Sequence, residues 1–467
     1  MSTSENVQHY DFVVIGSGPA GQKAAVCAAK AGKKVLVIER ERAVGGACVH
    51  HGTIPSKTLR ETVTALRGLS RRSGAAVPPP AEVSALVTRL EDVVIGHEAY
   101  IEAQLRRNDV DIARGHATFV TPHEIEIRSP RGGKHRVSAE YVILAVGSRP
   151  REPKGVPVDH ERILDSDSIL SMTYLPRTLV VLGGGVVASE YTSIFAACGV
   201  DVTVVDTSPR PMSFLDPELT AAYLQQLEAL GGKYLAERKI KEVRHHGIAQ
   251  CEVILEDGHT MIADKVLSAL GRVANVEGLG LDIPGVALTA RGLVAVDGSC
   301  RTNVTHIYAV GDVGGPPSLA SSAMEQGRRA VRHALGHDSP VSPEASGLLP
   351  FCAYTIPEIA SVGLSEQEVI AKHGSALVGR APYSELARAH IAALDAGMIK
   401  LVAEPGTRRL LGVQIVGESA SELVHVGQMA ILAGFAIDTF IEATFNFPTL
   451  AEGYRVAALD IVNRYKL

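Results

Sequence analysis

Short runs of apolar residues that end at a glycine or at an acidic residue are the first pattern along this chain. Residues 12–15 are all apolar and lead into a glycine-rich loop at 16–21, then into an alanine-rich stretch that ends at Gly32. A second apolar run at 35–38 ends at Glu39. Apolar runs bounded by turns indicate buried strands, and an alanine-rich stretch favours a helix. We therefore predict a β-α-β unit.

The same pattern occurs a second time. From Thr178 an apolar run at 179–182 leads into a glycine-rich loop at 183–188, a stretch ending at Gly199, and a run at 202–205 that ends at Asp206. The last residue of the loop, Gly21 or Ala188, lies 11 residues before the glycine that ends the helix in both copies. The acidic residue follows that glycine by 7 residues in both. A lone glycine-rich turn is weak evidence, whereas a whole unit repeated in register indicates two dinucleotide-binding units.

Each position in these units has a physical role. One glycine allows the tight turn, one lets the backbone approach a pyrophosphate, and the third allows helix and strand to pack closely. The pyrophosphate lies at the helix N-terminus, and the acid accepts hydrogen bonds from a ribose. The predicted contacts are Gly16, Gly18, Pro19, Gly21, Glu39 and Arg40 in the first copy, and Gly183, Gly185, Val186, Asp206 and Arg210 in the second.

Later segments extend the prediction to the whole chain. Residues 123–142 and 251–266 read as antiparallel meanders that return to the two sheets, and the prolines at 78–80 read as a surface loop. Apolar runs at 398–402 and 411–416, followed by helical stretches, predict a third domain. The expected fold class is α/β, with two Rossmann-like dinucleotide-binding domains and a C-terminal α+β domain. Two dinucleotide sites suggest electron transfer between two nucleotide cofactors.

Composition excludes several other classes of protein. The chain has 467 residues, 46% hydrophobic and 21% charged, with a net charge of -5 and a pI near 6.4. Such a chain has no basic field for nucleic acid or an acidic membrane surface. It also has no apolar run long enough to span a membrane and no signal peptide, so a cytoplasmic location is expected. Six scattered cysteines match neither a disulfide scaffold nor a metal site, and we predict no metal.

Several motifs resemble the flavoprotein pyridine nucleotide-disulfide oxidoreductases over essentially the whole chain. Residues 44–57 resemble the redox-active segment, 306–312 the second FAD segment and 144–150 the crossover that leaves the FAD domain. The resemblance implies that the first unit binds FAD and the second NAD(H) or NADP(H). The further nucleotide contacts it implies are Gly45, Gly46, Cys48, Lys57, Gly147, Gly311 and Asp312 for FAD, and Gly271 at the end of the matching strand.

The resemblance also implies domain limits and assembly. The FAD-binding domain is expected at 1–155 and 272–345, the NAD(P)-binding domain at 156–271 and a dimerisation domain at 346–467. A twofold homodimer is expected, with higher assemblies left open. Residues 447–452 of one subunit are then expected to reach the flavin of the other.

Two departures from the family pattern concern its thiol chemistry. Disulfide reductases of this family have cysteines five positions apart, but here Thr53 follows Cys48 at that spacing. The family's C-terminal histidine is replaced by Phe447. Threonine forms neither a disulfide nor a nucleophilic thiolate, so the dithiol relay is predicted to be absent. Residues 48–57 and 447–459 instead resemble the Si-specific soluble pyridine nucleotide transhydrogenases, which implies hydride exchange, NADPH + NAD⁺ = NADP⁺ + NADH, by a ping-pong cycle through flavin N5.

The resemblance places Lys57 and Glu190 as a pair beside flavin N5, where the cation would favour reduced flavin. A salt bridge without effect on rate is the alternative. Thr53 is expected against the flavin as a neutral filler, or in a purely structural role. His50 and His51 could border the nicotinamide or be plain polar residues, and Glu452 could retain a role without its histidine.

Nucleotide preference rests on the loop after the second unit. Asp206 favours NAD(H), because a carboxylate binds the ribose 2′-OH and repels a 2′-phosphate. Arg210, with the neighbouring hydroxyls, could accept that phosphate if Asp206 turned away, or could be only a solvated charge.

Three other functions share this scaffold. An NAD(P)H-dependent reductase of quinones, dyes or oxygen is the nearest alternative. A dithiol reductase such as dihydrolipoamide dehydrogenase conflicts with Thr53 and Phe447. A non-catalytic, redox-sensing flavoprotein would not need two intact nucleotide sites.

Overall fold

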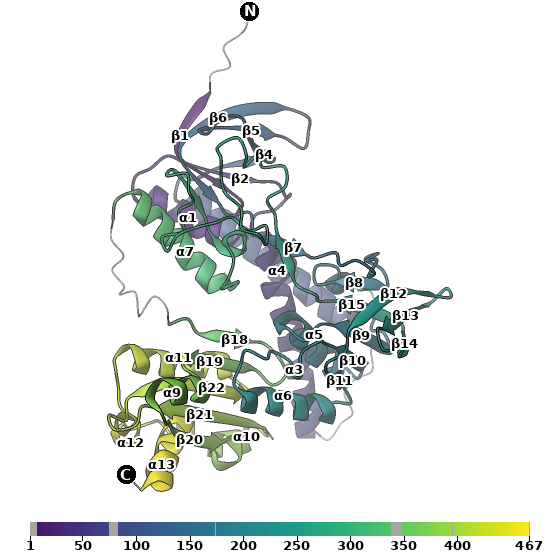
Figure 1. Cartoon of the computed structure of the whole chain (residues 1–467), viewed down its shortest axis with the longest axis vertical. Coiled ribbons are helices and arrows are strands. Elements are labelled where there is room, and N and C mark those ends of the chain that lie inside the picture. The colour runs from purple at the N-terminus through teal and green to yellow at the C-terminus, as the bar shows by residue number, and fades with distance from the viewer. Residues whose placement is uncertain (1–6, 74–82, 173, 338–347, 395, 467) are drawn as a thin grey trace, which may run out of the picture. The chain divides into compact units, whose positions relative to one another are not determined.

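The computed structural model describes residues 7–73, 83–172, 174–337, 348–394 and 396–466, and its chain divides into two compact units (Figure 1). The first unit comprises Met1–Thr58, Val87–Arg151 and Gly271–Pro340, and the second comprises Leu59–Leu86, Glu152–Leu270 and Val341–Leu467. The three-domain limits given above differ from this two-unit division and stay a prediction. The proline run at 78–80 lies outside the described residues.

A seven-stranded sheet forms the centre of the first unit. Its order is β3-β2-β1-β6-β5-β4, with β17 pairing with β6. The pairs among β1, β2, β3, β6 and β17 are parallel, and β4, β5 and β6 form the expected antiparallel meander. The strands are β1 (Gln8–Ile15), β2 (Val35–Glu39), β3 (Asp111–Arg114), β4 (His116–Phe119), β5 (Glu124–Arg128), β6 (Lys134–Leu144) and β17 (Ile307–Ala309).

Helices cover one face of this sheet. The alanine-rich helix α1 (Pro19–Lys30) packs beside α7 (Ala320–Ala334) and shares a core cluster with the end of α4 (Val83–Arg106). Gly327 allows α7 to approach α1, because an added Cβ would lie 2.3 Å from the carbonyl oxygen of Ala20. The other face packs against the meander and the segment from 274 to 313. The remaining elements here are α2 (Gly46–His50), η3 (Gly311–Gly314), and the antiparallel pair β7 (Ser148–Pro150) and β16 (Arg272–Ala274).

The second copy of the β-α-β pattern forms a parallel five-stranded sheet in the second unit. Its order is β11-β10-β9-β15-β8. The elements are β8 (Ile163–Asp165), η2 (Ile169–Ser171), β9 (Thr178–Leu182), α5 (Val186–Ala197), β10 (Asp201–Val205), α6 (Pro217–Ala229), β11 (Lys233–Leu235) and β15 (Lys265–Ser268). The meander expected at 251–266 is present as β13 (Gln250–Leu255) and β14 (Thr260–Ala263), and β12 (Ile240–His246) extends it by pairing with β13. The first part of the long helix α3 (Thr53–Ser73) belongs to the first unit and the rest to this one.

The C-terminal part of the second unit is the predicted α+β domain. Its antiparallel sheet has the order β18-β19-β22-β21-β20. The strands are β18 (Phe351–Ala353), β19 (Ile359–Gly363), β20 (Leu377–Pro382), β21 (Gly397–Ala403) and β22 (Leu410–Gly417). The helices are α9 (Glu366–His373), η4 (Tyr383–Glu385), α10 (Ala387–Ile391), α11 (Ala420–Leu432), α12 (Asp438–Glu442) and α13 (Gly453–Tyr465). Fold class and domain types are thus as predicted.

Candidate functional site

The first glycine-rich loop is shaped by backbone contacts that leave no room for side chains. Gly16 has φ +102°, and an added Cβ would lie 2.4 Å from the carbonyl oxygen of Ala145. A Cβ on Gly21 would lie 2.0 Å from the carbonyl oxygen of Gly16. Helix α1 begins at Pro19, and its N-cap, Gly18, makes no side-chain capping bond. The loop therefore brings the positive end of α1 close behind β1.

A second glycine turn touches this loop. The backbone N–H of Gly45 donates to the hydroxyl of Ser17 at 3.0 Å. Gly46, at φ +62°, lies so near Gly18 that an added Cβ would be 2.8 Å from the Gly18 Cα. Helix α2 starts at Gly46, so the first turns of two helices meet the same loop. An added Cβ on Gly18 itself meets nothing within 4 Å, which leaves open space beside these N–H groups.

Glu39 ends β2 as predicted and is buried, with 5% of its surface exposed. Its Oε2 accepts a hydrogen bond from the backbone N–H of Ser17 at 2.9 Å, and its Oε1 accepts one from that of Glu41 at 2.9 Å. The carboxylate is therefore fixed next to the glycine-rich loop. Arg40 is exposed, and its Nε lies 3.1 Å from a carboxylate oxygen of Glu41.

Asp312 lies in η3, at the end of β17, and is oriented by residues from two other segments. Its Oδ2 accepts a hydrogen bond from the Ser148 hydroxyl at 2.6 Å, and Arg272 donates to that hydroxyl from Nε at 2.8 Å. The neighbouring Gly311 donates its N–H to Gln326 at 2.7 Å. Sequence reasoning found Asp312 but not Arg272, although Arg272 directly follows the predicted Gly271.

Glycine also marks both chain crossovers. Gly147 has φ +65° and precedes β7, and Gly271 has φ +98° and precedes β16. The N–H of Arg151 donates to the carbonyl oxygen of Gly271 at 3.0 Å, which ties the two crossovers together within the first unit.

Cys48 and Thr53 lie together within the first unit. Burial raises the pKa of the Cys48 thiol, and the Thr53 hydroxyl and the charge of Lys57 oppose that rise. All six cysteines are free. A thiol with a raised pKa is mostly protonated at neutral pH and is a poor nucleophile.

The residues that flank this pair are also placed. The His50 ring bonds the carbonyl oxygen of Val44 at 2.9 Å, whereas His51 is exposed. Lys57 lies in the first turns of α3, with its Nζ 3.2 Å from the Ser56 hydroxyl.

The first unit fits FAD on these observations. Two helix N-termini and a glycine-rich loop provide N–H donors for a diphosphate, and the open space at Gly18 leaves room for it. Glu39 offers a fixed carboxylate for a ribose, and Asp312 offers another on the adjoining strand end. The donor set is therefore that of a dinucleotide site.

The second glycine-rich loop repeats this construction with a difference at its centre. Gly183 has φ +102°, and an added Cβ would lie 2.8 Å from the carbonyl oxygen of Ala269. Helix α5 begins at Val186 with Gly185 as its N-cap, and a Cβ on Gly185 would meet nothing within 4 Å. The carbonyl oxygen of Gly184 accepts a hydrogen bond from the N–H of Met212 at 2.8 Å, so the following loop folds back over this turn.

Asp206 follows β10 and is held by a residue that sequence reasoning missed. The hydroxyl of Tyr234 donates to its Oδ2 at 2.8 Å, and the N–H of Thr207 donates to its Oδ1 at 2.8 Å. Burial and the hydrogen bond to Asp206 raise the pKa of Tyr234, so its hydroxyl remains a donor. Arg210 instead donates to the Thr220 hydroxyl at 2.9 Å and to the carbonyl oxygen of Ser213 at 2.7 Å.

Glu190 lies on α5 in the second unit, with 5% of its surface exposed. Its Oε1 accepts a hydrogen bond from the backbone N–H of Tyr354, just after β18. The C-terminal domain thus helps to orient this carboxylate. Lys57 belongs to the first unit and Glu190 to the second, and their pairing stays a prediction.

The two family positions near the C-terminus differ in exposure. Phe447 is 67% exposed, and Glu452 is half-buried at the start of α13. A subunit therefore presents the phenyl ring at its surface.

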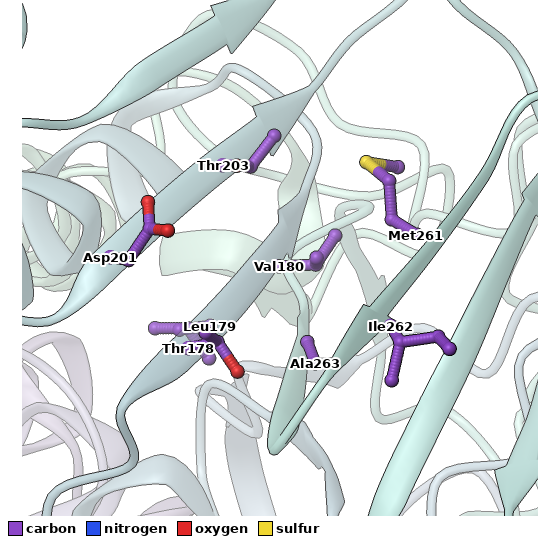
Figure 2. A pocket seen from close by; sticks show the side chains of 8 residues that line it. All are labelled: Thr178, Leu179, Val180, Asp201, Thr203, Met261, Ile262 and Ala263. Atoms are coloured by element: carbon purple, nitrogen blue, oxygen red, sulfur yellow. The ribbon is translucent and has the colours of Figure 1, made fainter.

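Figure 2 shows a pocket beside the second nucleotide sheet, near the starts of its strands and away from the glycine-rich loop. It is lined by Thr178, Leu179, Val180, Asp201, Thr203, Met261, Ile262 and Ala263. These residues come from the first halves of β9 and β10 and from β14. Ligands of open parallel sheets bind beyond the carboxyl ends of the strands, so this pocket is not the nucleotide site.

The described part of the chain lacks two further features. No helix there is long and apolar enough to cross a membrane. Histidine, cysteine and acidic side chains do not gather there in groups of three or more that could hold a metal ion.

Comparison with known proteins identifies the family of this chain. The family model described as pyridine nucleotide-disulphide oxidoreductase matches residues 10–327, and that of its dimerisation domain matches 349–458. A relative from Mycobacterium bovis named soluble pyridine nucleotide transhydrogenase is 42% identical over 98% of both chains. One of the same name from Photobacterium profundum is 39% identical over 99% of this chain and 100% of its own.

A solved structure gives the same result for the fold. LpdA from Mycobacterium tuberculosis is 29% identical, with a TM-score of 0.88 over 97% of this chain and 99% of its own. Matches of this extent in sequence and structure, together with the two dinucleotide-binding units, lead to one conclusion. The chain belongs to the pyridine nucleotide-disulphide oxidoreductase family.

Proposed function

We propose that this chain catalyses hydride exchange between NADPH and NAD⁺, giving NADP⁺ and NADH, without a redox-active disulfide. The observation that carries the proposal is that Thr53 stands beside the Cys48 thiol, at the two positions where the family's reductases have their cysteine pair. Relatives at 39 to 42% identity over nearly their whole length are named soluble pyridine nucleotide transhydrogenase, which supports it.

The enzyme is an oxidoreductase that uses FAD and NAD(P)(H), as its family does. Bound FAD supplies the ability to accept a hydride from one nucleotide and return it to another. The N–H groups at the starts of α1 and α2 bind its diphosphate, and Glu39 binds a ribose. Asp312, fixed through Ser148 and Arg272, binds the ribityl chain.

The thiol route of the family is closed in this chain. Cys48 lacks a sulfur partner at position 53, and its raised pKa keeps the thiol protonated. Phe447 has no titratable group to manage thiol protons at the position of the family's histidine. Electrons therefore leave toward an acceptor that reaches the ring directly, and a second nicotinamide is such an acceptor.

One nucleotide site serves both substrates in turn, which makes the cycle ping-pong. The Gly183–Gly185 turn and the N-terminus of α5 bind the pyrophosphate of either nucleotide, and Asp206 reads the ribose. Gly271, between β15 and β16, lies at the crossover that follows this sheet. Held by these residues, the nicotinamide would exchange hydride with the Si face of bound FAD, and its positioning in a dry site would supply most of the rate enhancement.

Lys57, Glu190 and Thr53 form the immediate surroundings of N5 in this proposal. As the family resemblance implies, Glu190 would orient the Lys57 ammonium, and this cation would stabilise negative charge on the reduced ring when FAD is bound. Thr53 fills the place of a reactive thiol with a neutral hydroxyl. None of the three takes part in a proton transfer, because hydride transfer itself needs no general base.

The matched dimerisation domain indicates a homodimer, and we place residues 447–452 of one subunit at the flavin of its partner. The exposed Phe447 ring is available for such a contact. We also place the enzyme in the cytoplasm, because its six cysteines are all free, as is usual in a reducing compartment.

Anaerobic transfer from NADPH to thio-NAD⁺ tests the proposal. The reduced thio-nucleotide absorbs at a different wavelength from NADPH, so its formation can be followed directly. Initial rates measured over a range of both substrate concentrations should give parallel double-reciprocal lines. Lipoamide and glutathione disulfide serve as controls and should not be reduced. Rapid quinone turnover with negligible transfer would instead identify a quinone reductase and overturn the proposal.

A further inference from the structure

The hydroxyl of Tyr234 joins two neighbouring strands of the second nucleotide sheet. Tyr234 lies on β11, in register with Val204 of β10, and its hydroxyl reaches past the end of β10 to Asp206. The oxygen lies 2.8 Å from Asp206 Oδ2 and 3.3 Å from the carbonyl oxygen of Ser208. A phenol has one proton to donate, and the nearer, charged carboxylate is the stronger acceptor.

Asp206 is thereby held through both of its carboxylate oxygens. Thr207 donates its backbone N–H to Oδ1, while Tyr234 donates to Oδ2. The pair lies directly against the central glycine of the loop, since a Cβ added to Gly184 would be 2.3 Å from Asp206 Oδ2 and 2.9 Å from the Tyr234 oxygen. The carboxylate is thus fixed beside the turn that binds the pyrophosphate.

The nearby cation is bound elsewhere. The Arg210 guanidinium donates to the hydroxyl of Thr220 on α6 and to the carbonyl oxygen of Ser213. The arrangement in the structure therefore offers a fixed carboxylate for a 2′-OH and a negative charge against a 2′-phosphate. Exchange between NADPH and NAD⁺ requires the site to accept both, so the restraint on Asp206 sets the balance between them.

We propose that Tyr234 is a specificity-determining positioning residue, whose hydroxyl holds Asp206 in the orientation that favours NAD(H) over NADP(H). The inference rests on the proposed function, because that function requires NADP(H) as a second substrate. It assigns a role in substrate choice to a residue outside the reacting atoms. Tyr234 acts through Asp206, so its effect is on nucleotide binding rather than on the rate of hydride transfer.

Tyr234→Phe tests this with the loss of a single oxygen atom. The Kd for NADH should rise about 3- to 10-fold, the loss expected for one hydrogen bond that preorganises a charged group. The Kd for NADPH should stay within about 2-fold or fall, since a released carboxylate repels the phosphate no more strongly. The limiting rate of flavin reduction by NADH should not change. The variant should therefore raise KM for NADH and leave kcat unaltered.

Two further variants isolate the route of the effect. In an Asp206→Ala background, adding Tyr234→Phe should change neither Kd further, because the partner is gone. Tyr10→Phe is the matched control: it removes a phenol–carboxylate bond of 3.0 Å, to Asp111, in the first unit. It should leave the ratio of the two dissociation constants unaltered. FAD content and melting temperature establish that each variant is folded.

Equal weakening of both nucleotides, no change in the ratio, or an effect that persists without Asp206 would overturn the inference. Binding is measured separately from turnover, so the outcomes remain distinguishable. If the wild-type protein binds both nucleotides and Tyr234→Phe has the predicted effect, but the wild-type protein transfers no hydride, the proposed function alone would be wrong.

Discussion

At the scale of single residues, we propose that a threonine decides which electron acceptor the flavin can use. Thr53 has almost the volume of a cysteine, and α3 begins at this residue shortly after α2 ends at His50, so both helices form without the second sulfur. The substitution changes chemistry and leaves packing nearly intact. A scaffold built for thiol exchange is in this way left with nucleotides as its reactants.

A buried lysine shows the opposite case, a residue whose role is structural. Lys400 has no exposed surface, and its Nζ lies 2.8 Å from Asp216, 2.6 Å from Glu218 and 2.7 Å from Glu366. Arg380 adds a bond of 2.6 Å to Glu218. The cluster joins the start of α6 to the C-terminal sheet, within the second unit.

Replacing Lys400 with Met should lower the free energy of unfolding by about 3 to 5 kcal/mol, because it removes the cation that pairs with the buried Asp216 carboxylate. Lys134→Met is the control, since that lysine pairs with Glu126 at the surface and should cost at most about 1 kcal/mol. Urea unfolding measures both. Equal losses in the two variants would contradict the assignment of a buried network.

The same cluster gives a direction for acid unfolding. Hydrogen bonds from Arg380 and Lys400 lower the pKa of Glu218 from 4.5 to about 2. A carboxyl whose pKa is lowered by folding stabilises the fold above its unfolded pKa, and this contribution is lost as pH falls from about 4.5 toward 2. Lys400→Met should therefore flatten the loss of stability in that window.

The residues that the sequence could predict are those set by local geometry. Glu39 and Asp206 follow from strand-end positions after a glycine-rich loop, and Asp312 from a family motif. Tyr234 and Arg272 could not be found in that way, because each reaches its partner from a distant segment. Lys400 stands in an apolar run that gives no sign of carboxylates 182 and 184 residues away.

At the scale of elements, the repeated β-α-β unit was predictable because its spacing is fixed by helix length. The meanders were predictable from their glycine turns and alternating polarity. Strands β11 and β12 and helix α6 were not, since their sequences carry short or mixed patterns that tertiary contacts decide. The site nevertheless depends on them, because β11 carries Tyr234 and α6 carries Thr220.

The contact between α1 and α7 is a testable feature of the FAD site. Gly327→Ala would place a Cβ 2.3 Å from the carbonyl oxygen of Ala20 and 3.1 Å from the nitrogen of Ala24. Alanine gains about 1 kcal/mol over glycine in a helix, but overpacking against backbone costs about 1 to 3 kcal/mol. We expect a net loss of stability and of retained FAD, because α1 carries the diphosphate site.

Gly96→Ala provides the matched control for this prediction. Gly96 also lies inside a helix, α4, and an added Cβ there meets nothing within 4 Å. That variant should be stabilised by up to about 1 kcal/mol with full FAD content. A stabilised Gly327→Ala protein with full FAD content would show that the helices can separate without cost.

At the scale of the whole molecule, the C-terminal domain carries a candidate assembly surface and also contacts Glu190 of α5. Helix α11 exposes Val426, Met429 and Leu432 at three-residue intervals, an apolar row that suits the homodimer its family domain indicates. The same domain supplies the Tyr354 N–H that orients Glu190. Assembly and the surroundings of the nucleotide site are therefore built from one domain.

The central claim is that the flavin works without a dithiol, and anaerobic titration of the purified enzyme with dithionite tests it most directly. The absorbance of the oxidised flavin is followed against reducing equivalents added. The account predicts that reduction is complete after about two electrons per FAD, because the bound flavin is the sole acceptor. Uptake of about four electrons per FAD would reveal a redox-active disulfide and contradict the account.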